Sequence, residues 1–148
     1  MPDIRHRIGT TAPRARVYEA FATTDGLRGF WTRDVKGESA IGSNLEFFFG
    51  SPDPSAVMEV VDLVPDTRVA WRCVEGPEEW VGTNLTFELR SMGDETVVLF
   101  THADWQQPSE FMHHCSTKWG YFFLGLKRWL EGSDSVAYPD DAAISSWR

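Results

Sequence analysis

Residues 108–131 form the segment that most constrains the fold of this chain, because they predict one long, strongly apolar helix. Pro108 stands at its start, Lys127 and Arg128 stand in its last turn, and Gly132 follows its end. Large apolar residues recur at steps of three and four and therefore share a face: Phe111, Cys115, Trp119, Phe122, Leu126 and Trp129, widened by Phe123 and Leu130. Such a helix must be covered by another element, and the strands predicted before it are the only candidate.

The composition limits the classes of partner. A length of 148 residues suits one domain that needs neither a disulfide nor a metal for stability. A net charge of −8 argues against nucleic acid and anionic membranes, since both require clustered Lys and Arg. No signal peptide or membrane span is visible, so we expect a cytoplasmic protein in which Cys73 and Cys115 are reduced and buried.

The first third of the chain predicts a strand followed by two short helices. Residues 4–10 alternate as a strand does, with Ile4 and His6 on one side. Pro13 suits the first turn of a helix that follows this strand. Asp25 is expected to cap a second short helix.

A run of about six strands then fills residues 34–104. Glycine- and proline-rich turn signals separate the apolar segments, and no helical pattern intervenes. The last two strands are predicted at residues 80–90 and 96–104, joined by a turn at residues 92–94. Consecutive strands with short connections predict an antiparallel meander and therefore an α+β fold.

The glycines inside the long helix and the segment that follows the helix allow two further predictions. Gly120 and Gly125 lie in the helix interior, where each costs up to about 1 kcal/mol relative to alanine. We expect them to permit close approach of the helix backbone to the sheet or to the short helices. Residues 1–132 are predicted to form the domain and residues 133–148 a C-terminal tail, docked by Tyr138 and Trp147.

Five segments in this order resemble the START-like (SRPBCC) superfamily and, within it, the AHSA-type branch named after the activator of the heat-shock-protein ATPase. They are residues 8–32, 58–73, 80–89, 93–105 and 118–133. The resemblance implies a helix-grip fold, in which a curved antiparallel sheet of six to seven strands wraps around a long C-terminal helix. It also implies an apolar cavity between sheet and helix. The additional domain of the full co-chaperone has no counterpart in the matched segments.

Proteins of this superfamily commonly bind lipids, sterols or polyketides in such a cavity. Our leading hypothesis is therefore a non-enzymatic binder of a lipid-, sterol- or polyketide-like molecule. Aromatic residues make up 14% of the chain, more than helix packing requires, and aromatic side chains commonly line apolar pockets. No cofactor is expected. The predicted lining residues are Trp71, Trp80, Phe87, Phe100, Cys115, Trp119 and Phe122, with Phe30 and Trp31 at the mouth.

Polar residues support an alternative, a cyclase- or hydrolase-like enzyme in the same cavity. His102 and Asp104 fall on the same side of the last strand and are candidates for acid–base chemistry. The AHSA-type branch widely carries histidine at the position of His102, which implies a structural hydrogen bond as readily as catalysis. Arg72, paired with Glu59 or Glu46, is a candidate to hold the polar head of a ligand.

The sequence argues against a metal site and leaves a role in protein interaction open. His113 and His114 are adjacent on a helix and point about 100° apart, so they cannot hold one metal ion together. No metal site is therefore expected. A third hypothesis, a protein-interaction module that acts on a chaperone or a regulator, stays open, and so does a homodimer.

Overall fold

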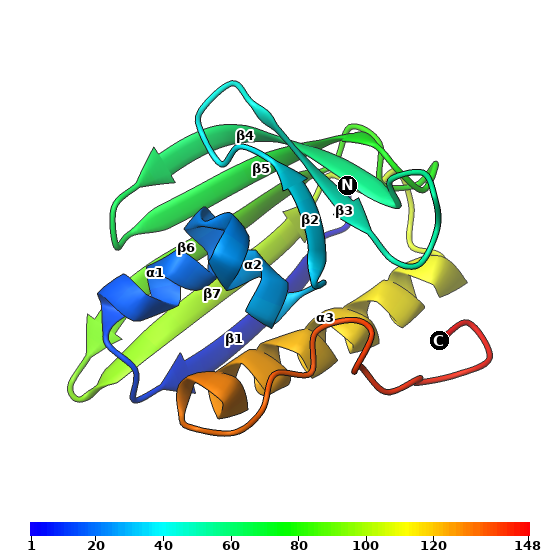
Figure 1. Cartoon of the computed structure of the whole chain (residues 1–148). Helices are drawn as coiled ribbons and strands as arrows, with labels where there is room; N and C mark the ends of the chain where they lie inside the picture. The colour runs from blue at the N-terminus through cyan, green and yellow to red at the C-terminus, as the bar shows by residue number, and fades with distance from the viewer.

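The computed structural model describes all residues, 1–148, and confirms the predicted α+β helix-grip fold (Figure 1). The elements in chain order are β1 (Ile4–Thr10), α1 (Arg14–Ala22), α2 (Thr24–Phe30), β2 (Asp34–Gly37), β3 (Asn44–Phe48), β4 (Ala56–Val64), β5 (Arg68–Glu75), β6 (Asn84–Met92), β7 (Glu95–Ala103) and α3 (Glu110–Leu130). The seven strands form one sheet in the order β1-β7-β6-β5-β4-β3-β2. All neighbouring strands pair antiparallel. Strands β2 to β7 form a meander, and β1 pairs with β7 at its edge.

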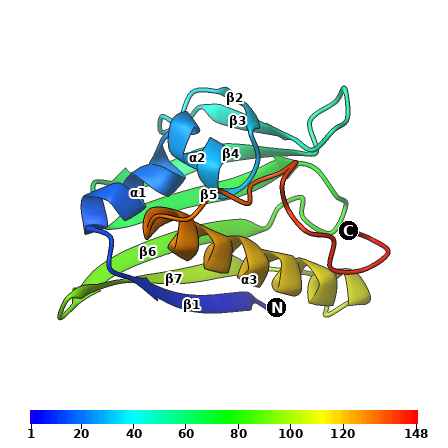
Figure 2. The same ribbon diagram turned by 60° about the horizontal axis from the view of Figure 1, so that its bottom comes forward.

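The sheet curves around α3, which runs along β1 and β7 (Figure 2). Ring contacts show what joins the layers. Phe21 of α1 stacks on Phe87 of β6 with 4.5 Å between ring centroids, and Phe100 of β7 lies 4.8 Å from Trp119 of α3. The helices therefore bury their apolar faces on the same, inner face of the sheet.

Helix α3 begins two residues after the predicted start. The hydroxyl of Ser109 accepts a hydrogen bond from the Met112 N–H at 3.1 Å and caps the helix. The predicted apolar face is buried along its centre, while Phe111 and Trp129 at its two ends are half-buried. The cap of α2 differs from the prediction, because Thr23, not Asp25, accepts a hydrogen bond from the Gly26 N–H.

The strand predicted to begin at Trp80 begins at Asn84 instead. The Trp80 N–H donates to the carbonyl of Pro77 at 2.8 Å, and the Thr83 N–H donates to the carbonyl of Trp80 at 2.9 Å. These bonds close a turn between β5 and β6. The apolar character of Trp80 extends the alternating pattern of β6, which is why the sequence places the residue in the strand.

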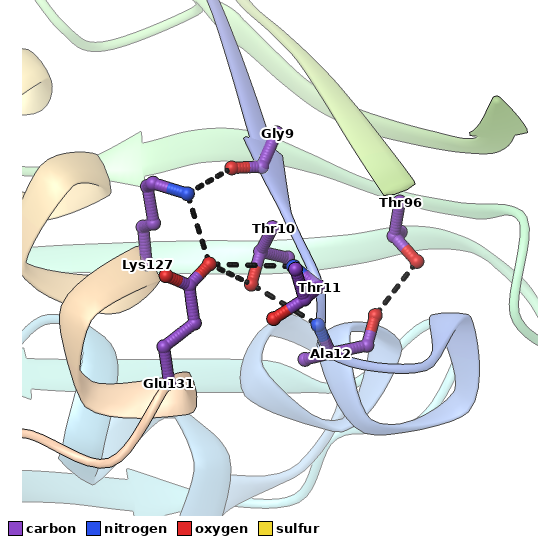
Figure 3. A network of polar contacts seen from close by, with 7 residues as sticks. All are labelled: Gly9, Thr10, Thr11, Ala12, Thr96, Lys127 and Glu131. Atoms are coloured by element: carbon purple, nitrogen blue, oxygen red, sulfur yellow. Dashed lines mark hydrogen bonds and ion pairs between the residues drawn. The ribbon is translucent and has the colours of Figure 1, made fainter. Parts of the chain in front are cut away.

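A polar network fixes the C-terminal end of α3 to the end of β1 (Figure 3). Lys127 Nζ donates to the carbonyl of Gly9 at 2.8 Å and to Glu131 at 2.9 Å. The same Glu131 carboxylate accepts from the hydroxyl of Thr10 at 2.9 Å and from the N–H of Thr11 at 3.3 Å. Hydrogen bonds to Lys127 and Thr10 lower the pKa of Glu131, so the carboxylate stays charged.

The C-terminal tail, residues 133–148, folds back along α3. The Tyr138 N–H donates to the carbonyl of Trp31 at 2.9 Å, and the Tyr138 carbonyl accepts from the Arg33 N–H at 3.0 Å. The tail is thus docked at Tyr138, as expected. Trp147 is 51% exposed, and its ring lies 5.7 Å from that of His114, measured between centroids.

The two helix glycines do not serve the close approach that the sequence suggested. A Cβ at Gly125 would overlap the side chain of Val136 in the tail, so this glycine makes room for the tail and not for the sheet. A Cβ at Gly120 would meet His6 Cε1 at 3.6 Å, an ordinary contact. No helix of the protein is long and apolar enough to cross a membrane.

Candidate functional site

Aromatic rings fill the space between the sheet and the C-terminal half of α3. We call Phe21, Phe30, Phe87, Phe100 and Phe123 the aromatic core. Each of these side chains is at most 2% exposed. The ring centroid of Phe87 lies 4.5 to 6.3 Å from the centroids of the other four rings. This half of the interior is therefore packed solid.

The N-terminal half of α3 faces a pocket of about 440 Å³, which we call the aromatic pocket. Its walls come from α3, from Trp31 at the end of α2, from the β3–β4 connection with the start of β4, from the β5–β6 connection, and from the tail. The volume lies within the range of roughly 300–1,000 Å³ that small-molecule sites occupy. Eight aromatic side chains line it: Trp31, Phe49, Trp80, Phe111, Trp119, Phe122, Tyr138 and Trp147.

The structure divides the nine predicted apolar site residues into two groups. The aromatic pocket is lined by Trp31, Trp80, Cys115, Trp119 and Phe122. The other four, Phe30, Trp71, Phe87 and Phe100, are at most 1% exposed and lie in the packed interior. Strand alternation predicts that these four point inward, but it does not tell whether another ring fills the space in front of them.

His102 is enclosed by aromatic side chains behind the pocket wall and is fully buried. The Trp119 indole N–H donates to His102 Nδ1 at 3.2 Å. Nδ1 is then the acceptor, so Nε2 carries the proton and donates to Thr83 Oγ1 at 2.8 Å, and the Thr83 hydroxyl in turn donates to the Trp80 carbonyl. Burial lowers the pKa of His102 to about 3, so the ring is neutral.

The expected pairing of His102 with Asp104 is absent. Asp104 has φ of 71°, lies just beyond the end of β7 and is exposed, and its carboxylate accepts from Asn84 Nδ2 at 2.7 Å. The left-handed backbone turns its side chain away from the strand alternation on which the prediction rested. The hydrogen bonds of His102 join β7, α3 and the β5–β6 turn, which is the structural role that the family resemblance also allowed.

Arg72 does not reach the pocket either. It lies opposite Glu59 in the β4–β5 register, but its side chain is exposed on the outer face of the sheet and forms no ion pair. Its inner-face neighbours Trp71 and Cys73 are fully buried. An arginine between two inward residues of a half-solvated sheet points to water, which is the simpler outcome for mid-strand charges.

The charged part of the pocket wall comes from residues that the sequence did not single out. Lys118 Nζ lies 2.6 Å from Asp141 Oδ2 and 2.8 Å from the carbonyl of Ala142. Lys118 shares the helix face of Cys115 by a spacing of three, a signal that was available in the sequence. Asp141 gives no such signal, because the pair spans 23 residues.

Two further titratable groups that line the pocket, Cys115 and His114, are neutral at pH 7. Burial raises the pKa of the Cys115 thiol to about 12, so it is not a thiolate nucleophile. Burial, and then the charge of Lys118, lower the pKa of His114. No cluster of three His, Cys, Asp or Glu side chains with the geometry of a metal site occurs in the protein.

Comparison with known proteins identifies the family. The family model described as "Activator of Hsp90 ATPase homolog 1-like protein" matches residues 11–131. The chain belongs to the AHSA1 family. This result confirms the AHSA-type branch and the START-like fold that the sequence motifs indicated.

Solved structures of similar proteins agree in fold. The Aha1 dimer from Colwellia psychrerythraea is 39% identical, covers 89% of this chain and 98% of its own, and has a TM-score of 0.82. SSP2350 from Staphylococcus saprophyticus is 21% identical over 90% of this chain and 95% of its own (TM-score 0.74). CalU16 from Micromonospora echinospora is 18% identical over 88% of this chain and 76% of its own (TM-score 0.71). The last two show the fold alone, and no protein of curated function matches significantly.

Proposed function

We propose that this AHSA1-family protein binds an apolar, aromatic small molecule in the aromatic pocket. The observation that carries the proposal is a pocket of about 440 Å³ with eight aromatic rings on its walls, next to an interior that is otherwise filled by rings. Burial of an apolar ligand surface there contributes roughly 25 cal/mol per Å². Aromatic walls also favour flat ligands, because rings stack with an offset or meet edge to face.

The polar groups around the pocket favour binding over catalysis. The acid–base candidate His102 lies behind Trp119, with its two ring nitrogens already hydrogen-bonded. The Cys115 thiol has a raised pKa, and the Lys118 ammonium is paired with Asp141. None of these groups is an unpaired base or an activated nucleophile, which is what chemistry on a bound molecule requires.

A fluorescence titration with N-phenyl-1-naphthylamine, a neutral probe that brightens in apolar sites, tests the proposal. We expect saturable binding with one site per chain. Cys115→Phe places a ring in the void and should weaken binding about tenfold or more, whereas Cys115→Ala leaves the void open and should bind like the wild type. Absence of saturable binding, or unchanged affinity in Cys115→Phe, contradicts the proposal.

Two predictions about protein partners stay separate from the pocket. The family description names an Hsp90 ATPase activator, and the relative from Colwellia psychrerythraea is described as a dimer. A pull-down with purified chaperone and light scattering of the isolated chain test these two predictions for this protein.

A further inference from the structure

Lys118 is the only charged side chain that α3 contributes to the aromatic pocket. Its side chain is 16% exposed, and its ammonium lies 5.3 Å from the ring centroids of both Tyr121 and Phe122. A cation held among rings is largely desolvated and requires an anionic partner. In this structure the partner is Asp141 of the tail.

Asp141 is an incompletely satisfied partner. Its side chain is 7% exposed, and Oδ2 bonds Lys118, but the buried Oδ1 has no hydrogen-bond partner. A buried carboxylate oxygen without a donor is unfavourable, because the oxygen has lost its water and gained nothing. Asp141 therefore holds Lys118 less well than a carboxylate with both oxygens bonded.

The tail is docked up to Ala142, whose N–H donates to the Tyr121 hydroxyl at 2.9 Å and whose carbonyl accepts from Lys118 at 2.8 Å, and it is loosely held beyond that residue. Before Asp141, backbone hydrogen bonds join Tyr138 to Trp31 and Arg33. After Ala142, the only hydrogen bonds of residues 143–148 are local ones to Ser145. This distal tail, residues 143–148, still supplies Trp147 and Arg148 to the pocket wall. Its displacement would widen the pocket without disturbing the docked part.

The charges on the wall favour one kind of ligand. The charged side chains that line the pocket are Lys118, Asp141 and Arg148, in a protein whose net charge is −8. Without Asp141, the charged side chains of the lining residues are the two cations Lys118 and Arg148. Arg148 forms no ion pair in the structure and faces the same pocket.

We infer that the ligand of the aromatic pocket carries an anionic group, a carboxylate or a sulfonate, which replaces Asp141 on Lys118 and releases the distal tail. The inference rests on the proposed function and adds the charge of the ligand and the way it enters. Asp141 is then an internal stand-in for the ligand anion, and the tail competes with the ligand for one ammonium group. A ligand can shift this equilibrium only by binding the open state better, and a fully bonded anion on Lys118 does so.

Two probes that share one apolar body distinguish the inference from the proposed function. 8-Anilinonaphthalene-1-sulfonate carries a sulfonate, and N-phenyl-1-naphthylamine lacks it. Lys118→Met keeps the length of the side chain and removes its charge. We expect it to weaken binding of the anionic probe about tenfold or more, since hydrogen bonds to charged groups are the strong ones, and to leave the neutral probe within about twofold.

One further test variant, Asp141→Asn, and two controls of matched charge, Lys36→Met and Asp140→Asn, complete the comparison. Lys36→Met removes an exposed cation on β2 and should leave the preference for the anionic probe unchanged. Asp141→Asn weakens the internal competitor and should raise affinity for the anionic probe about threefold to tenfold. Asp140→Asn, which removes the exposed neighbour that pairs with Arg33, should not change it.

Nuclear magnetic resonance of the wild type gives a second measurement that does not depend on a variant. With the anionic probe bound, the amide signals of residues 143–148 should sharpen and move toward positions typical of a disordered chain. The neutral probe should leave them in place.

Each outcome separates the two claims. If the neutral probe fails to bind, the proposed function falls. If it binds but Lys118→Met does not alter the preference for the anionic probe, or Lys36→Met alters it equally, the inference is overturned and the proposed function stands. The inference is also overturned if Arg148→Gln, and not Lys118→Met, removes the preference for the anionic probe. It is overturned as well if the tail stays ordered when the anionic probe is bound.

Discussion

The two halves of the α3 apolar face have the same kind of sequence and different surroundings. Phe123 and Leu126 in the C-terminal half are 2% exposed and pack into the aromatic core. Phe111 and Cys115 in the N-terminal half face the aromatic pocket. Trp119 stands at the boundary, because its ring lies 4.8 Å from Phe100 of the core and 4.9 Å from Trp31 of the pocket wall.

The difference comes from what lies opposite each half. Helices α1 and α2 send Phe21 and Phe30 against the C-terminal half, and the network of Lys127 and Glu131 ties that end to β1 (Figure 3). Opposite the N-terminal half lie Trp31 at the end of α2, the start of β4, two connections between strands, and the tail. A hydrophobic helix face therefore becomes part of the core or the wall of a pocket, according to the elements that cover it.

Truncation of a ring in each half should separate them most clearly. Phe87→Ala removes the centre of the aromatic core and should cost about 3–5 kcal/mol of unfolding free energy, because the cavity cannot collapse. Phe49→Ala removes a half-buried ring on the pocket wall and should cost less than about 2 kcal/mol. Urea unfolding measures both. Equal losses would mean that the two halves are equally packed.

The hydrogen-bonded His102 at the boundary predicts a pH dependence of stability. Its pKa falls from 6.5 to about 3 on folding, so below pH 6.5 the unfolded chain binds a proton that the folded protein does not. Stability is thus complete above pH 6.5 and is lost as the pH falls, by up to about 1.4 kcal/mol per pH unit. Between pH 6.5 and 5 the loss is about 2 kcal/mol.

Unfolding of His102→Gln at several pH values checks the assignment. This variant should lose most of the pH dependence between pH 6.5 and 5, while His113→Gln, which alters an exposed histidine, should keep it. An unchanged pH dependence in His102→Gln would show that the buried imidazole is not its source.

The smallest effects should come from the two helix glycines. Gly120→Ala adds a methyl group at an ordinary contact distance from His6 and should stabilise the protein by up to about 1 kcal/mol, the gain in helix propensity. Gly125→Ala pushes against Val136 and should lose that gain by displacing the tail. Thermal unfolding and amide signals of residues 133–142 measure the pair. Stabilisation by Gly125→Ala with an undisturbed tail would contradict the described docking.

Local patterns allowed the elements to be predicted, whereas long-range packing decided the site. The face of α3 and the antiparallel meander follow from periodicity and turn signals, and both are confirmed, whereas the pairing of β1 with β7 was not predicted. The turn position of Trp80 was missed, because an apolar residue before a strand extends its alternation. Strand alternation indicated that Phe87 and Phe100 point inward, but not that they meet other rings there.

The polar residues of the pocket wall were harder to predict from the sequence. Lys118 was available from its helix spacing, but its partner Asp141 stands in a segment without periodicity. His114 was set aside because two adjacent histidines cannot hold one metal ion, and the structure places it on the pocket wall for another reason, its ring contacts with Phe111 and Trp147.

The central claim is that a ligand occupies the N-terminal half of the α3 face and leaves the other half untouched. The seven tryptophans report on this directly through their indole N–H resonances. Titration with N-phenyl-1-naphthylamine should move the signals of Trp31, Trp80 and Trp119, which line the pocket, and leave those of Trp105 and Trp129, which do not. Shifts confined to Trp105 and Trp129, or no shift in any pocket tryptophan at saturation, would contradict the account.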